Sequence, residues 1–201
     1  MKKLVFYSIL ILVAGFYSCT NGSKKVVSEE PKVKNIIFMI GDGMGVSQVH
    51  AAMEKAEEML NMEKAEYTGL CTTHSLTQKI TDSAAGGTAM ATGKKTKNGI
   101  IGQDTTGQAL QTILEYAESK GLATGLISTS AITHATPASF IAHQPSRNLA
   151  EAIAADFLKT DIEVFIGGGY DHFANREDGA NLVDSLIAKG YKVDTTLEAV
   201  M

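Results

Sequence analysis

Several features are scarce in this 201-residue sequence, and each scarcity excludes a class of protein. Two cysteines are too few for the disulfide framework that holds many small secreted domains together. Three prolines and an ordinary share of apolar residues exclude a fibrous or largely disordered chain. A formal net charge of −4 gives no sign of the basic surface that nucleic-acid binding requires. The remaining class is a globular domain with a substantial core.

The longest apolar run is short and lies near the N-terminus. Lys2 and Lys3 precede it, and it covers residues 4–16. Such a length is typical of a secretory signal and too short to span a bilayer comfortably. Tyr17-Ser18-Cys19 follows and resembles a lipobox, in which Cys19 becomes the lipidated first residue; a plain secretory signal is the alternative.

We therefore expect a signal peptide over residues 1–18 and a lipidated N-terminus with a polar tether over 19–33. The protein would be exported, either to the periplasm or as a lipoprotein anchored to the outer membrane. If Cys19 carries lipid, Cys71 has no partner, and we expect it to be a small buried apolar residue.

Beyond the tether, short apolar runs alternate with helical patterns. Strands are expected over residues 35–40, 70–75, 122–129, 162–166 and 191–193. Helices are expected over residues 46–60, 83–92, 109–120, 137–143, 148–159 and 181–189. This alternation predicts an α/β fold, a three-layer sandwich around a mostly parallel sheet. In such sheets ligands bind beyond the carboxyl ends of the strands.

A glycine-rich turn follows the first expected strand and contains Asp42, in the sequence Gly-Asp-Gly-Met-Gly. The glycines allow a tight turn and close approach of a ligand, and the carboxylate can point into a site. The spacing is not that of a dinucleotide-binding loop. On its own the pattern favours an ordinary turn or capping aspartate.

Ser83 opens a helical segment rich in alanine and glycine, directly after Asp82. The first turn of a helix has free N–H groups and a positive dipole end, which favour an alkoxide and a nearby phosphate. Local physics alone favours residues that merely cap the helix. A P-loop is excluded because the spacing from Gly87 to Gly93 is wrong and Lys95 replaces the required hydroxyl residue.

Three further residues suggest chemistry but have ordinary alternatives. Thr136, before a proline, is a natural cap whose hydroxyl suits a hard cation. His134 alone is usually a hydrogen-bonded histidine. Arg147 suits bidentate phosphate binding, although most lone arginines are surface charges. The pair 171–172 (Asp-His) looks like a metal pair, but its polar, glycine-rich setting predicts a surface loop.

Taken in order, these segments resemble the successive motifs of alkaline phosphatases. The matching segments are 35–45 (NIIFMIGDGMG), 80–88 (ITDSAAGGT), 92–102 (TGKKTKNGIIG), 121–129 (GLATGLIST) and 133–147 (THATPASFIAHQPSR). The segment 80–88 matches the family's nucleophile signature at every position. The resemblance implies that residues 34–201 are the N-terminal portion of an alkaline phosphatase domain.

The resemblance implies a metal-dependent phosphomonoesterase that forms a phosphoserine on Ser83. Arg147 would clamp two phosphate oxygens, and Asp82 would help to orient Arg147. The substrates would be phosphate monoesters, and a clamp for two non-bridging oxygens argues against phosphodiesters and sulfate esters.

The resemblance also implies zinc and magnesium as cofactors. Asp42 would bridge one zinc and the magnesium, and Thr136 would bind the magnesium. His134 lies at a position beside the magnesium that is Asp in some family members and His in others.

The family's remaining metal ligands lie in the second half of its fold and are not among these residues. We therefore expect a truncated family member, with an exposed sheet edge, that is inactive as it stands. A complete polypeptide would be a candidate homodimer. The alternative is a catalytically inactive, exported lipoprotein that binds phosphate or metal.

Overall fold

The structure is a computed structural model that describes residues 33–196. The expected signal peptide, Cys19 and nearly all of the expected tether lie outside the described residues. The chain divides into two compact units, residues 1–40 and residues 41–201. Among the described residues, no helix is both long enough and apolar enough to cross a membrane.

The first unit contributes residues 33–40 to the described part of the chain, and they form neither helix nor strand. Ile36 and Ile37 are 87% and 86% exposed. The prediction of a buried strand over 35–40 is therefore wrong for this structure. A strand needs a neighbouring backbone to pair its N–H and C=O groups, and residues 33–40 belong to neither the sheet nor the isolated bridges of the described chain.

The second unit opens with helix α2 (Val46–Lys55) and the 3₁₀ helix η1 (Asn61–Lys64). The expected helix over 46–60 ends early because Ala56 adopts an extended conformation. Residues 70–75 form no strand, contrary to expectation, and the free Cys71 is exposed rather than buried. Ser75 is the first buried residue along the described chain.

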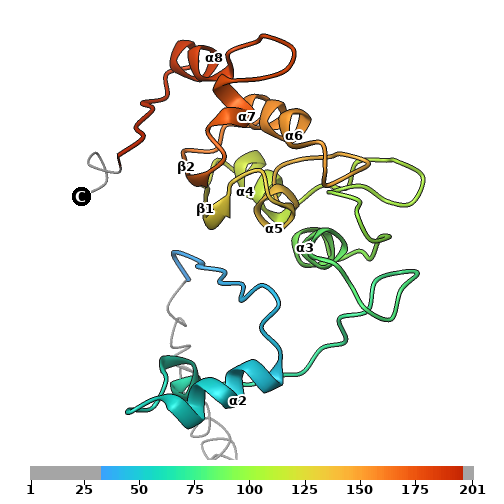
Figure 1. Ribbon diagram of the computed structural model, residues 1–201, viewed down its shortest axis with the longest axis vertical. Helices are drawn as coiled ribbons and strands as arrows, with labels where there is room; N and C mark the ends of the chain where they lie inside the picture. The colour runs from blue at the N-terminus through green and yellow to red at the C-terminus, as the bar shows by residue number, and fades with distance from the viewer. Residues whose placement is uncertain (1–32, 197–201) are drawn as a thin grey trace, which may run out of the picture. The chain divides into compact units, whose positions relative to one another are not determined.

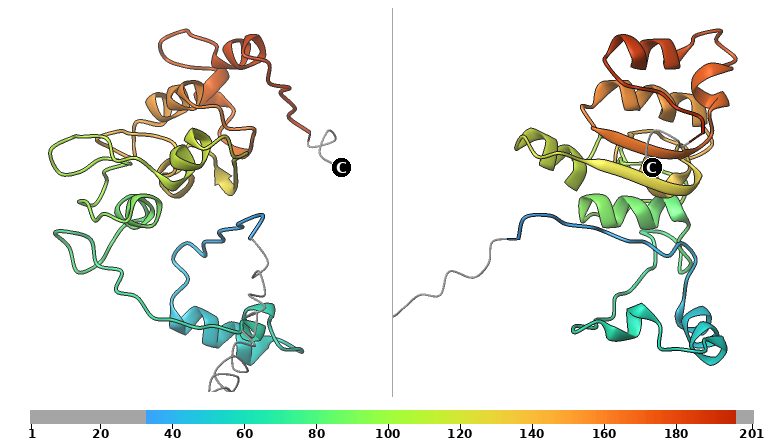
Figure 2. Two further views of the ribbon diagram at one scale, coloured as in Figure 1. Left: turned by 180° about the vertical axis from the view of Figure 1, so that it is seen from behind. Right: turned by 90° about the vertical axis from the view of Figure 1, so that its left-hand side faces the viewer.

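A two-stranded parallel sheet occupies the centre of the second unit within the described residues (Figure 2). Strand β1 (Gly125–Ala131) pairs with β2 (Val164–Gly168), and the register irregularity falls between Ile127 and Ala131. Both expected strands are confirmed with shifted ends. Residues 191–193 form no strand, although the Tyr191 hydroxyl donates to the carbonyl of Ile162.

Helices precede, connect and follow the two strands (Figure 1). Before β1 come α3 (Ser83–Thr92) and α4 (Ile113–Ser119). The connection from β1 to β2 contains α5 (Ala135–Ala138), α6 (Ala150–Asp156) and the 3₁₀ helix η2 (Phe157–Lys159). After β2 come α7 (Asp171–Ala174) and α8 (Leu182–Ala188). This parallel crossover through helices confirms the predicted α/β class.

The described core lies around the β1–β2 crossover. Phe157 is fully buried, with its ring centroid 4.8 Å from that of Phe165 and 5.8 Å from that of Phe173. Ile153 and Ile162 are buried in the same crossover. Aromatic rings at these separations contribute more than their buried area alone. Helix α5 begins shortly after the carboxyl end of β1.

Candidate active site

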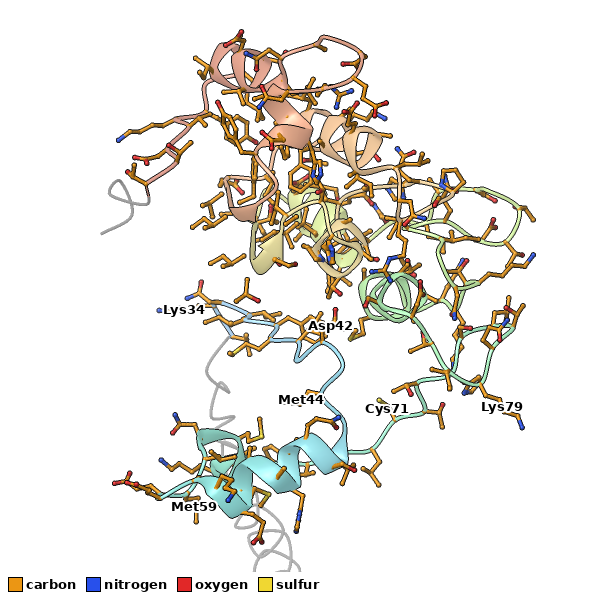
Figure 3. The ribbon with its side chains drawn as sticks, viewed as in Figure 1. Lys34, Asp42, Met44, Met59, Cys71 and Lys79 are labelled. Carbon is orange, nitrogen blue, oxygen red and sulfur yellow. The ribbon has the colours of Figure 1, made fainter. Side chains whose placement is uncertain are left out.

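Asp42, Ser83 and Thr136 come together although they are far apart in sequence (Figure 3 labels Asp42). The Ser83 hydroxyl donates to Asp42 Oδ1 at 3.2 Å. The Thr136 hydroxyl donates to Asp42 Oδ2 at 2.7 Å. The expected glycine-rich turn, the start of the Ser83 helix and the segment after β1 therefore share one carboxylate. Asp42 is not a simple capping residue, because both of its oxygens bind side chains of distant segments.

Asp82 is the N-cap of α3 and places Ser83 in the first helical turn. Asp82 Oδ1 accepts a hydrogen bond from the Ala85 N–H at 2.9 Å. The Ser83 hydroxyl therefore lies at the end of a ten-residue helix where the dipole is positive. The sequence prediction of a helix over 83–92 is confirmed at both ends.

The second oxygen of Asp82 ties the helix start to Arg147. Asp82 Oδ2 accepts from the Gly99 N–H at 2.9 Å and from Arg147 Nη1 at 3.3 Å. The backbone N–H of Arg147 donates to the Gly99 carbonyl at 2.7 Å. The guanidinium is partly buried, with 29% of its side chain exposed. Arg147 is therefore fixed at two points, its guanidinium by Asp82 and its backbone by Gly99.

The loop at residues 98–99 is a part of this arrangement that sequence reasoning did not identify. Asn98 Oδ1 accepts from the Asp82 N–H at 3.3 Å, and Asn98 Nδ2 donates to the Ile80 carbonyl at 3.1 Å. Gly99 has a φ of +88°, which favours glycine. The Asn-Gly dipeptide is a recognised turn signal, so it could have located the turn but not its contacts.

The small residues of α3 allow a close approach to α5, as their composition suggests. A Cβ atom on Gly87 would lie 2.9 Å from Ser139 Oγ and 3.5 Å from the Thr136 Cα. Gly87 and Ser139 are buried. Packing of the α3 backbone at Gly87 on the Ser139 side chain therefore sets the separation of the helix that carries Ser83 from the short helix that carries Thr136.

The structure places His134 and Thr136 differently from the sequence prediction. The expected helix over 137–143 is replaced by α5, so Thr136 lies inside the helix and His134 is its N-cap residue. Helix formation starts earlier because the His134 carbonyl already accepts a helical hydrogen bond from the Ala138 N–H at 2.9 Å. His134 is exposed, two residues before Thr136.

The pair 171–172 is not a surface loop, contrary to prediction. Asp171 and His172 open α7, and Phe173 in the same helix is buried. His172 Nδ1 lies 2.7 Å from the Thr133 hydroxyl, next to His134 in sequence. Burial of Phe173 explains why this polar stretch folds back onto the strand ends rather than remaining in solvent.

The residues that could hold a metal fit a hard cation better than zinc. The oxygens of Asp42 and Thr136 lie 2.7 Å apart, and oxygen ligands suit magnesium. Within residues 33–196, no three His, Cys, Asp or Glu side chains gather in a way that could hold a metal ion. Protein zinc sites usually have three or four such ligands, and no such set lies within the described residues.

Comparison with known proteins identifies relatives along most of the chain. The family model for alkaline phosphatase matches residues 33–199. Alkaline phosphatase 4 of Bacillus subtilis is 36% identical, over 99% of this chain and 47% of its own length. The alkaline phosphatase of Escherichia coli K12 is 36% identical, over 83% of this chain and 42% of its own length.

Comparison with solved structures also identifies alkaline phosphatases as relatives. The alkaline phosphatase from the Antarctic bacterium TAB5 has a TM-score of 0.75 and 38% identity, over 77% of this chain and 45% of its own. A histidine-to-aspartate mutant of that enzyme was solved with Mg bound in its M3 site. The chain spans less than half the length of these relatives. From its sequence and its fold, the chain belongs to the alkaline phosphatase family.

Proposed function

We propose that this chain carries the nucleophile half of a phosphomonoesterase that acts through a phosphoserine on Ser83. The observation that carries the proposal is the convergence of Ser83 and Thr136 on Asp42. Family membership supports the phosphatase class. The activity belongs to a polypeptide that also contains the second half of the fold, because the relatives are about twice as long.

Ser83 is suited to attack phosphorus. Its hydroxyl proton points to Asp42 Oδ1, and the positive end of α3 favours negative charge on the serine oxygen. Attack breaks the ester P–O bond, releases the alcohol and leaves phosphate on Ser83. Water then hydrolyses the phosphoserine in a second displacement.

Arg147 is suited to bind the phosphoryl group. Its guanidinium has five N–H donors in a planar fork, and the hydrogen bond to Asp82 uses Nη1. The other donors of the fork can reach two non-bridging oxygens of a terminal phosphate. Charge stabilisation of this kind usually supplies a large share of the rate of phosphoryl transfer.

Asp42 and Thr136 would hold magnesium, with His134 beside it, and Asp42 would also contribute to a zinc site. Zinc and magnesium, when bound, lower the pKa of coordinated hydroxyl groups and stabilise charge on the leaving oxygen. The support for magnesium is the pair of converging oxygens and the Mg-bound structure of the relative. Zinc is proposed from the family resemblance alone.

The alternative is a phosphate- or metal-binding protein without catalysis. It is favoured by one observation, the absence of a three-ligand metal cluster within residues 33–196. Phosphate labelling of Ser83 distinguishes the two functions, since only an enzyme transfers phosphate to this residue.

The test of the proposal is acid-quench labelling with phosphate followed by peptide mapping. The chain is completed with the second half of the enzyme, from its own downstream sequence or from a Bacillus relative, and loaded with zinc and magnesium. We expect label on Ser83, loss of label in Ser83→Ala, and unchanged label in the control Ser130→Ala. Label on any other residue would show that the proposed mechanism is wrong.

Two related measurements separate the roles of the other residues. Arg147→Ala should keep serine phosphorylation but lower kcat/KM by about tens- to several-hundred-fold, corresponding to about 2–4 kcal/mol. The 201-residue chain alone should hydrolyse aryl phosphates negligibly with excess zinc and magnesium. Robust metal-dependent turnover by the chain alone would contradict the assignment of the missing ligands to the second half.

We also propose that the protein is exported and anchored by lipid on Cys19. The support is the sequence of residues 1–19, with two lysines, an apolar run and a cysteine at its end. Mass spectrometry of the mature protein should find a diacylated Cys19 as the first residue. A mature N-terminus that is unmodified or begins elsewhere would exclude the lipoprotein and leave the plain secretory signal.

A further inference from the structure

His143 lies four residues before Arg147 and is held by both ring nitrogens. Nδ1 is 2.7 Å from the Gly102 carbonyl, and Nε2 is 2.7 Å from Glu115 Oε1. The imidazole and the Glu115 carboxyl are about three-quarters buried, with 22% and 25% of their side chains exposed. His143 therefore bridges the loop that contains Gly102 and the first turn of α4.

Both partners of the ring accept hydrogen bonds. A backbone carbonyl has no proton to donate, so Nδ1 must carry one. Glu115 Oε2 accepts from the Thr112 N–H at 2.8 Å, the arrangement of an ionised carboxylate in a capping box. A neutral imidazole has one N–H and could donate to only one of the two acceptors. Two donors are present only in the imidazolium form.

The charged groups around the ring favour the imidazolium. Glu115 faces it from α4, and Asp156 faces its backbone from α6, where Asp156 Oδ2 accepts from the His143 N–H at 3.0 Å. Asp156 also pairs with Lys159, with Nζ at 2.6 Å from Oδ1. On the loop side, Asp104 is engaged within its own turn by Thr106 and Gln108.

These contacts shift both pKa values in a consistent direction. The hydrogen bond with Glu115 raises the pKa of His143 against the opposing effect of burial, and the Gly102 carbonyl adds to the rise. Burial raises the pKa of Glu115, but hydrogen bonds from His143 and Thr112 outweigh it, so the net shift is downward. The ion pair is therefore complete between the lowered pKa of Glu115 and the raised pKa of His143.

The bridge is connected to Arg147 through paired backbone segments. The Ile101 N–H donates to the Gln144 carbonyl, and the Gln144 N–H donates to the Ile101 carbonyl, both at 2.9 Å. Three residues after Gln144 and two residues before Ile101, the Arg147 N–H donates to the Gly99 carbonyl at 2.7 Å. His143 and Arg147 thus lie at the two ends of one short antiparallel contact.

We propose that His143 is held as an imidazolium and acts as a protonation-dependent positioning residue for Arg147. When His143 loses a proton, one ring nitrogen no longer donates, and either Gly102 or Glu115 loses its partner. The loop over 99–102 is then held less firmly against the segment that leads to Arg147. The protonation state rests on the contacts of His143 alone, whereas its consequence for phosphate binding rests on the proposed function of Arg147.

The test is a pH titration of the ¹⁵N-labelled chain by NMR, reading the ring nitrogens of His143 and the backbone amides of Gly99 and Arg147. We expect both ring nitrogens to carry protons at neutral pH, with a titration midpoint above the ordinary value for histidine. The two amide signals should shift with the same midpoint. This readout needs no phosphatase activity, so its failure is distinguishable from failure of the proposed function.

Matched variants sharpen the test. Glu115→Gln removes the charge but keeps a similar shape, and it should lower the His143 midpoint. The control Glu54→Gln removes the carboxylate of the exposed pair with His50, whose atoms are 3.8 Å apart, and should leave the His143 midpoint unchanged. If Glu115→Gln does not fold, the titration of the unmodified chain still decides the protonation state.

Three results would overturn the proposal. A single protonated ring nitrogen at neutral pH would exclude the imidazolium. Equal His143 midpoints in Glu115→Gln and in the unmodified chain would exclude the ion pair as its cause. Amide signals of Gly99 and Arg147 that do not follow the His143 midpoint would exclude the positioning role.

Discussion

Helices α2 and α3 are both ten residues long and both have an aspartate within four residues before their first residue, yet they differ completely in burial. None of the residues in α2 is buried, whereas five residues of α3 are, including Ala84, Gly87 and Thr88. Apolar side chains of α2 such as Val46 and Met53 are exposed. The helix with the clearer apolar periodicity is therefore the one that lacks a buried face among the described residues.

The comparison shows that small side chains and fixed contacts, rather than apolar periodicity, establish the position of α3. Asp82 caps its first turn, and Thr88 Oγ1 accepts from the Gly102 N–H at 3.0 Å. Gly87 lies against Ser139. The cap is visible in the local sequence, but the contacts of Thr88 and Gly87 are not, because their partners come from distant segments. Substitutions in α3 should therefore be costly, and equivalent substitutions in α2 should not.

The largest difference in unfolding free energy between α3 and α2 is expected when a side chain is enlarged. Gly87→Val places a branched side chain where a Cβ atom alone would lie 2.9 Å from Ser139 Oγ. Overpacking of a buried contact costs about 2–3 kcal/mol of unfolding free energy. Ala51→Val adds similar bulk to the exposed surface of α2 and should cost about 0.5 kcal/mol or less.

Urea denaturation followed by circular dichroism measures both changes. Equal destabilisation by the two variants would contradict the comparison and would mean that α2 also packs closely against other residues.

A smaller difference in stability between the two helices is expected when a capping side chain is removed. Asp82→Ala removes the cap of α3 and the acceptor for Gly99 and Arg147, and it should cost about 2 kcal/mol. The matched change in α2 is Gln48→Ala, because Gln48 Oε1 accepts from the Gly45 N–H at 3.1 Å in an exposed setting. It should cost about 0.3 kcal/mol, since water replaces the lost acceptor.

The midpoints of thermal unfolding, measured for both cap variants in one buffer, test this order. A larger drop in the unfolding midpoint of Gln48→Ala than of Asp82→Ala would contradict the expected order. The outcome also bears on the site, because Asp82 holds the helix start and Arg147 together.

Helices were easier to predict from this sequence than strands. The segments 83–92 and 181–189 have caps, Asp82 and Asn181, whose side chains bond within the first turn, so their signals are local. Strand formation depends on a partner. The apolar runs at 122–129 and 162–166 pair with each other, but 35–40 and 70–75 form no strand in this structure. The α/β class was therefore predictable, and the extent of the sheet was not.

The candidate site was predicted in its residues but not in its contacts. Asp42, Ser83 and Thr136 each had an ordinary local explanation, and only the order of the motifs linked them. Their meeting at one carboxylate depends on long-range folding. The pairing of His143 with Glu115 had no local signal, since 28 residues separate them.

Gly99 connects the start of α3 to the backbone of Arg147. Its N–H donates to the Asp82 side chain and its carbonyl accepts from the Arg147 backbone. The loop therefore acts as a spacer of constant length between the start of α3 and Arg147. Because Ile101 pairs with Gln144 only two residues later, an inserted or deleted residue between positions 99 and 101 could not be absorbed locally.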